Sequence, residues 1–135
     1  MPDAKRLKRL HRVRTLQVGL ARAEEARTQA QLSSETQLAQ RIAQLADAVT
    51  PAPATTAGAV QMAAMAHFRD RLHRSAEAAA NRVRMAEQQV ERSAEATRGA
   101  RRDESAVEKL LDRRRAEDLR AEMKALEDAP HHKKR

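Results

Sequence analysis

The chain has no cysteine, tryptophan or tyrosine, and it has only one phenylalanine among 135 residues. The lack of cysteine excludes a disulfide scaffold, and the scarcity of β-branched and aromatic residues argues against a sheet protein. No apolar run approaches the roughly 18 residues that a membrane-spanning helix needs. Leu, Ile, Val and Phe together account for 21 residues, which is too few for the core of a globular domain.

Helix-forming residues make up most of the chain. Ala, Glu, Lys, Leu and Arg together supply 80 of the 135 residues, 29 of them alanine. This composition is typical of long helices and coiled coils. A net charge of +8 with few large apolar residues also fits a disordered chain, so the spacing of the apolar residues has to decide between the two.

One segment, residues 50–58 (TPAPATTAG), interrupts an otherwise helical sequence. Pro51 and Pro53 remove backbone donors and disfavour the helical conformation of the residues before them. We therefore expect a single all-α domain with two helices, at about 3–49 and 59–128, joined by this linker. A basic tail, 129–135, follows Pro130.

The second predicted helix has the clearer heptad repeat, which in a coiled coil marks the buried seam. Its two series of positions are 65, 72, 79, 86, 93, 100, 107 and 69, 76, 83, 90, 97, 104, 111, most of them small or apolar. In the first helix we expect the apolar stripe to follow Leu7, Leu10, Val13, Leu16 and Leu20, then Ala23, Ala26 and Ala30, and finally Leu38, Ile42, Leu45 and Val49.

A nine-residue linker allows the second helix to fold back as an antiparallel coiled-coil hairpin. If Val49 pairs with Ala59, facing residue numbers add up to about 108, and residues 106–128 of the longer second helix extend beyond the first. This predicted overhang carries Val107, Leu110, Leu111, Leu119, Met123 and Leu126. An unpaired apolar stripe indicates binding of a partner; self-association and a frayed helix end are the alternatives.

The sequence offers no catalytic, cofactor or metal site. A two-helix rod has no dehydrated concavity in which reactive groups could converge. His67 and His73 are spaced to point in different directions on a helix, and His131 and His132 belong to the tail. Phosphate loops, zinc spacings and nucleophile elbows are absent. We therefore expect a protein that is not an enzyme.

Positive charge is concentrated at the start of the chain, where residues 1–27 have a net charge of +5, and in the arginine run 113–115. Such a surface suits phosphates, an anionic membrane or an acidic protein. Nucleic-acid binding is disfavoured because stacking aromatic residues are missing. No apolar stretch follows the basic start, so no secretory signal is predicted and an intracellular protein is expected.

Four segments resemble the FliJ family of flagellar and type III export proteins. They are 7–14 (LKRLHRVR), the glutamate pair 24–25, 68–72 (FRDRL) and, most specifically, 108–117 (EKLLDRRRAE). The resemblance covers nearly the whole chain.

This resemblance implies a cytoplasmic stalk, similar to that of rotary ATPases, at the inner face of the cell membrane. The stalk would occupy the pore of the hexameric export ATPase, link it to the cytoplasmic domain of the membrane export gate, and have export chaperones as further partners. The residues assigned to the ATPase ring are Val107, Leu110, Leu111, Arg113, Arg114, Arg115, Leu119 and Met123; those assigned to the gate are Phe68, Leu72, Ser75 and Ala79. Phe68 and Leu72 equally suit packing against Leu38 and Ile42 near the linker.

Overall fold

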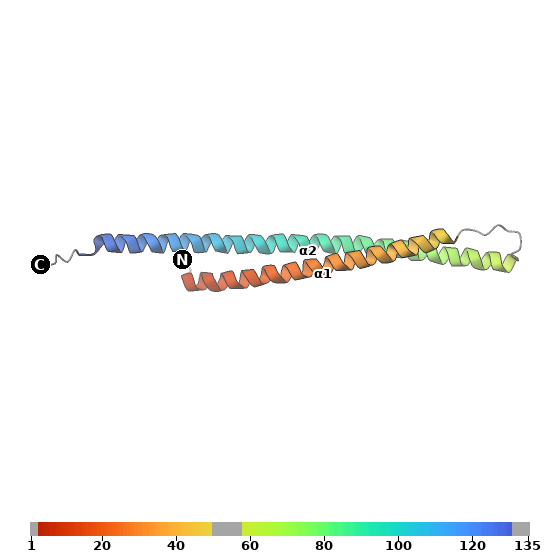
Figure 1. Cartoon of the computed structure of the whole chain (residues 1–135), viewed down its shortest axis with the longest axis horizontal. Helices are drawn as coiled ribbons and strands as arrows, with labels where there is room; N and C mark the ends of the chain where they lie inside the picture. The colour runs from red at the N-terminus through yellow and green to blue at the C-terminus, as the bar shows by residue number, and fades with distance from the viewer. Residues whose placement is uncertain (1–2, 50–57, 131–135) are drawn as a thin grey trace. The chain divides into compact units, whose positions relative to one another are not determined.

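The computed structural model describes residues 3–49 and 58–130, and these form two helices (Figure 1). Helix α1 comprises Ala4–Ala48 and helix α2 comprises Ala59–Asp128. The backbone carbonyls of Asp3 and Gly58 accept the first helical hydrogen bonds, from Leu7 and Met62, each at 3.1 Å. The two helices pack antiparallel and α2 is the longer, as the sequence predicts. The linker 50–57 and the tail 131–135, with His131 and His132, lie outside the described residues.

The chain divides into two compact units, each of which combines part of α1 with part of α2. The first, called here the terminal unit, consists of residues 1–22 and 96–135; the second, the linker unit, consists of residues 23–95. Neither helix contains, in its described residues, a stretch long and apolar enough to cross a membrane.

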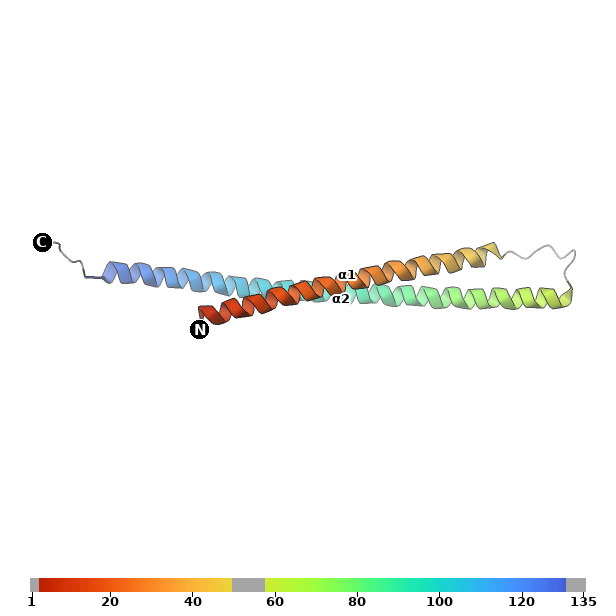
Figure 2. The same ribbon diagram turned by 60° about the horizontal axis from the view of Figure 1, so that its bottom comes forward.

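In the terminal unit, side chains of the two helices meet across a narrow seam. His11 Nε2 donates to Glu108 Oε1 at 3.2 Å, and the Arg14 guanidinium donates to Asp103 Oδ2 at 3.4 Å. The most buried apolar residues of this unit are Leu7, Val18, Val107 and Leu111. Figure 2 shows the start of α1, in red, beside the blue part of α2.

In the linker unit, the most buried seam residues are small. The hydroxyls of Thr28 and Ser93 lie 2.7 Å apart, and Arg82 Nε donates to Glu35 Oε2 at 3.3 Å. Ala79 and Ala86 are 1% and 6% exposed, so α1 and α2 lie close together there. Among the described residues, neither unit contains a large side chain that is fully buried. The core of the hairpin is therefore thin.

The burial pattern of α2 confirms the predicted heptads. The residues of the two predicted series from Arg69 to Leu111 are all buried or half-buried. The next position of the repeat, Arg114, is half-buried as well. Of the predicted positions, Met65 is exposed. The alternation of three- and four-residue steps is the periodicity of a two-stranded coiled coil.

The stripe predicted for α1 is wrong. Its seam follows positions 4, 7, 11, 14, 18, 21, 25, 28, 32, 35, 39, 42, 46 and 49, all buried or half-buried. Of the stripe residues, only Leu7, Ile42 and Val49 belong to this seam, whereas Leu10, Val13, Leu16, Leu20, Ala23, Ala26, Ala30, Leu38 and Leu45 are exposed. The reason is that polar residues at the seam positions of α1 pair with polar residues of α2 that lie in its seam or beside it.

The predicted register is wrong as well. In four cross-helix pairs of the described residues, two in each unit, the residue numbers add up to about 119 instead of about 108. The shift is about three helical turns. Residues 106–116 therefore do have α1 beside them, and α2 extends past α1 at both of its ends.

Candidate partner-binding surfaces

The last three turns of α2 form the first candidate surface. We call residues 117–128 the trailing segment; all of them are exposed, and in Figures 1 and 2 the blue end of α2 runs past the start of α1. At about 1.5 Å per residue the trailing segment is roughly 18 Å long. It is shorter than the predicted overhang because the true register brings α1 further along α2.

Three large apolar side chains project from the trailing segment on one side. Leu119, Met123 and Leu126 are 60%, 56% and 73% exposed. Their steps of four and three residues bring them onto one face of the helix. Leu110, further back on α2, is 43% exposed.

The other residues assigned to the ATPase ring differ in how exposed their side chains are. Val107 and Leu111 are buried between α1 and α2 and hold the hairpin together. Arg113 is exposed. Arg114 forms an ion pair with Asp118 at 3.3 Å, and Arg115 forms one with Asp112 at 3.9 Å, both within α2. The Arg115 pair is exposed and contributes little to stability, so Arg115 remains accessible to a partner, whereas Arg114 is half-buried at the edge of the seam.

The charge of the terminal unit is distributed unevenly between its helices. From residue 4 to residue 22, α1 has seven basic residues and no acidic one. The trailing segment has five acidic residues and two basic ones. The positive surface predicted for this end of the chain therefore belongs to α1, and the trailing segment is itself acidic.

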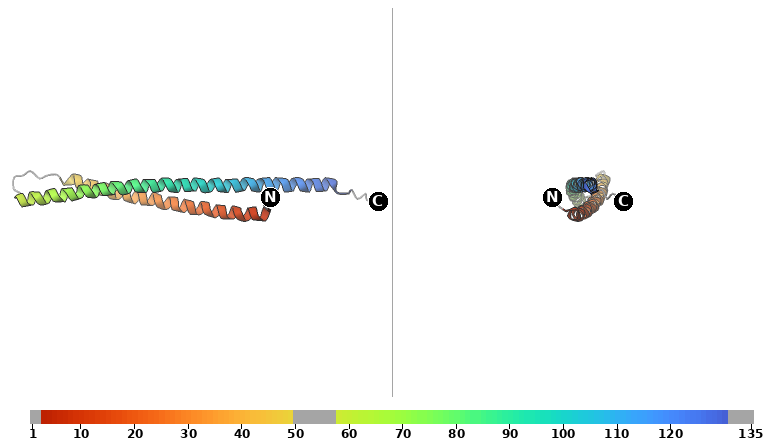
Figure 3. Two further views of the ribbon diagram at one scale, coloured as in Figure 1. Left: turned by 180° about the vertical axis from the view of Figure 1, so that it is seen from behind. Right: turned by 90° about the vertical axis from the view of Figure 1, so that its left-hand side faces the viewer.

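The start of α2 forms the second candidate surface. We call residues 59–68 the leading segment; all are exposed, including Val60, Met62, Met65 and Phe68. Figure 3 shows this part of α2, in light green, beyond the yellow end of α1.

The residues assigned to the export gate lie on one face of α2, and α1 covers part of that face. Phe68 is 49% exposed, Leu72 is half-buried, Ser75 is exposed and Ala79 is buried in the seam. Packing of Phe68 against Leu38 and Ile42, the alternative from the sequence, does not fit the observed register. Phe68 is thus the accessible member of this set.

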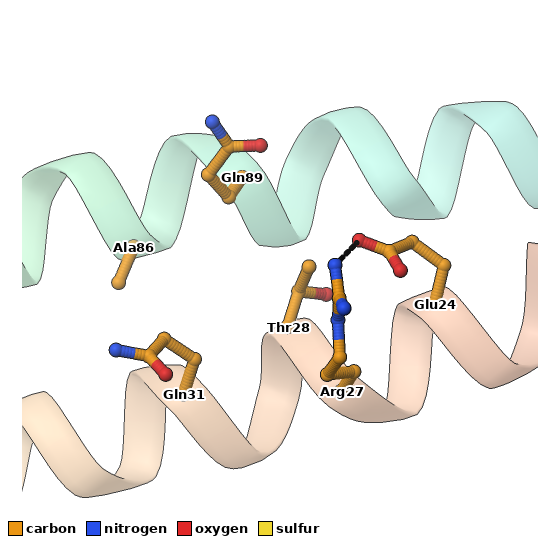
Figure 4. A pocket seen from close by; sticks show the side chains of 6 residues that line it. All are labelled: Glu24, Arg27, Thr28, Gln31, Ala86 and Gln89. Carbon is orange, nitrogen blue, oxygen red and sulfur yellow. Dashed lines mark hydrogen bonds and ion pairs between the residues drawn. The ribbon is translucent and has the colours of Figure 1, made fainter.

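One surface groove, of about 360 Å³, lies in the linker unit between Glu24, Arg27, Thr28, Gln31, Ala86 and Gln89. Figure 4 shows an ion pair within it, between Arg27 and Glu24 at 2.9 Å. The described part of the chain contains no group of three His, Asp or Glu side chains able to hold a metal ion.

One surface was missed by the sequence reasoning. Val13, Leu16 and Leu20 lie on the side of α1 turned away from the seam and are 48%, 68% and 72% exposed. We call these three residues the outer stripe. The apolar repeat is visible in the sequence but was predicted to lie in the hairpin seam. The polar residues His11 and Arg14, at seam spacing from Leu7 and Val18, were the signal that could have separated the two surfaces.

Comparison with protein-family models, with curated proteins and with solved structures gave no significant match to this chain.

Proposed function

We propose that the chain is a non-enzymatic stalk of a flagellar or type III protein-export apparatus, peripheral to the cytoplasmic side of the membrane. In this role it binds the pore of the hexameric export ATPase and couples the ring to the membrane export gate. Export chaperones are further candidate partners. The coiled-coil hairpin supports such a structural role, and the sequence resemblance to the FliJ family supplies the specific one.

The observation that carries the proposal is the unpaired trailing segment. Leu119, Met123 and Leu126 are exposed on the part of α2 that no other described residue of the chain covers. A single projecting helix is narrow enough to enter a ring, and its apolar face provides the contact that buries these side chains. Arg115 continues this face back along α2, whereas Leu110 and Arg113 lie on other sides of the helix.

The stalk would act on the ATPase without any reaction on its own chain. An asymmetric helix contacts the subunits of a symmetric ring unequally. It shifts the populations of the ring's states only if it binds some of them more tightly than others. At the opposite end of α2, exposed Phe68 and the leading segment would contact the gate.

The test is ATP turnover by the purified export ATPase from the same genome, with and without the full chain. We expect the chain to raise turnover, and we expect the double variant Leu119→Gln/Met123→Gln to lose most of this effect. Met85→Gln is the matched control, because Met85 is 66% exposed but belongs to the linker unit. Absence of both binding and stimulation by the unmodified chain would refute the proposal.

A separate binding assay tests the gate contact. Phe68→Ala should weaken binding to the purified cytoplasmic domain of the gate and leave stimulation of the ATPase unchanged. If Phe68→Ala and Met85→Gln bind the gate as the unmodified chain does, Phe68 is not part of that contact.

A basic rod that binds nucleic acid or an anionic membrane is the alternative proposal. It draws on the seven basic residues of α1 between residues 4 and 22. Binding through phosphates would weaken steeply as salt rises, whereas apolar docking of the trailing segment would not, so binding isotherms at two salt concentrations separate the two.

A further inference from the structure

We infer that the trailing segment of one molecule binds the outer stripe of α1 of a second copy of this chain. This contact does not depend on an export ATPase. The spacing of the exposed apolar residues and the charges around them support this contact, and no described residue of the chain covers the apolar side chains of either surface.

The apolar residues of the two surfaces match when the helices run antiparallel. Along the trailing segment, the steps from Leu119 to Met123 to Leu126 are four and three residues. Along α1 in the reverse direction, the steps from Leu20 to Leu16 to Val13 are also four and three. In this register Leu119 meets Leu20, Met123 meets Leu16, and Leu126 meets Val13. A parallel arrangement would set a step of four against a step of three.

The charges match in the same orientation. Antiparallel docking brings Glu127 and Asp128, at the end of the trailing segment, beside the basic start of α1, where Arg9 and Arg12 are exposed. Neither arginine forms an ion pair with any described residue, and Glu127 is likewise unpaired there. Opposite charges at the edges of a helix pair favour one partner and one orientation.

The outer stripe has the width of a helix-binding surface. Arg6, Arg9, Val13, Leu16 and Leu20 follow one line with steps of three and four residues, the narrow pattern of a coiled-coil contact. Helices that lie on a membrane surface have a broader apolar face with their cations on the opposite side. Here Arg6 and Arg9 lie on the apolar line itself, and in the antiparallel register Glu127 and Asp128 come within about one helical turn of Arg9.

The contact joins two different surfaces, so it does not close on itself as a symmetric dimer does. Each molecule offers one trailing segment and one outer stripe, and a trailing segment that projects past α1 cannot reach the outer stripe of its own chain without breaking α2. Association therefore continues from one molecule to the next. It uses the same three apolar residues as the proposed ATPase contact, so the two contacts exclude each other.

Sedimentation of the full chain over a range of concentrations tests this inference. We expect the weight-average mass to rise above 15.1 kDa with concentration, and to rise less at high salt. Leu16→Gln/Leu20→Gln removes the outer stripe, and Leu119→Gln/Met123→Gln removes the trailing contact; each variant alone should remain monomeric. All four side chains are exposed, so neither variant should unfold the hairpin, which circular dichroism verifies.

Mixing the two variants is the sharper measurement. The first variant retains an intact trailing segment and the second retains an intact outer stripe, so the mixture should form a complex of one molecule of each and grow no further. Met85→Gln should associate as the unmodified chain does. A monomeric unmodified chain, a mixture that stays monomeric, or association that survives either double variant would overturn the inference.

Two further measurements identify other occupants and separate this inference from the proposed function. Binding to vesicles of equal parts phosphatidylcholine and phosphatidylserine that requires Leu16 and Leu20, in a chain that does not self-associate, would overturn it in favour of a lipid surface. Leu16→Gln/Leu20→Gln should still stimulate the export ATPase, because the outer stripe has no part in that contact. The two proposals can thus fail independently.

Discussion

Leu7 and Leu16 belong to the same basic stretch of α1, yet Leu7 is 3% exposed and Leu16 is 68% exposed. The two leucines differ because the face of α1 that packs against α2 is the one whose polar residues find partners on α2. His11 and Arg14 follow Leu7 at seam spacing and reach Glu108 and Asp103. If Leu10 and Val13 occupied the seam instead, these acidic side chains of α2 would lose their partners.

The first prediction compares these two leucines. Leu7→Ala should lower the free energy of unfolding by about 2–4 kcal/mol, because it leaves a cavity in a thin core. Leu16→Ala should change it by less than about 0.5 kcal/mol, as expected for an exposed position. Urea denaturation followed by circular dichroism measures both values. Equal losses for the two variants would show that the seam has been assigned to the wrong face of α1.

The second prediction concerns the hydroxyl pair of the linker unit. Thr28 donates to the carbonyl of Glu25 at 2.9 Å, and its oxygen lies 2.7 Å from that of Ser93. Replacing one partner, in Thr28→Val or Ser93→Ala, should cost about 1 kcal/mol, because the hydrogen bond between the two helices is lost, while the remaining hydroxyl keeps the carbonyl of its own helix, Glu25 for Thr28 or Val90 for Ser93. The double variant should be close to neutral, since both polar groups are then removed. Additive losses in this double-mutant cycle would indicate that the two hydroxyls do not interact.

At the scale of the helices, the sequence predicts α2 much better than α1. Small and apolar residues recur at the heptad positions of α2, and nothing else on that helix competes with them. In α1 the strongest apolar repeat is the outer stripe, whereas seam positions include His11, Arg14 and Glu35. Hydrophobic periodicity alone therefore selects the wrong face, because it takes no account of polar residues that find partners across the seam.

The helix ends were predictable and the register was not. Helix α1 ends at Ala48, close to the predicted end at residue 49, because the effect of a proline on the residues before it is local and can be read from the sequence. The register depends on which polar residues pair across the seam, and a linker of this length allows several alignments. The register also decides which of the predicted binding residues are accessible. Leu119 and Met123 are exposed as expected, whereas Val107 and Leu111 are buried in the hairpin.

The third prediction is made at this scale. A chain that ends at Arg120 loses most of the trailing segment but none of the buried residues of the seam, so its free energy of unfolding should change by less than about 1 kcal/mol. A chain that ends at Asp103 also loses Val107 and Leu111, and it should unfold far more easily. Thermal unfolding of both shortened chains provides the comparison. Strong destabilisation by the shorter deletion would mean that residues 121–135 have a partner within the same molecule.

At the scale of the whole molecule, few side chains hold the hairpin together, and much apolar surface is left for others to cover. Within the described residues, α2 exposes large apolar side chains in both the leading and the trailing segment, and α1 exposes the outer stripe. A chain of this composition gains little from burying its own residues. Its function is therefore expected to depend on contacts with other chains, including further copies of itself.

All these proposals depend on the register of about 119, and cysteine cross-linking measures it most directly. The natural chain has no cysteine, so any disulfide comes from the introduced pair. Thr28→Cys/Ser93→Cys should oxidise readily to an intramolecular disulfide at low protein concentration, because the two side chains touch. Thr28→Cys/Ala80→Cys, which matches a register of about 108, should not. Efficient cross-linking of Cys at position 28 to position 80, and none to position 93, would contradict the account.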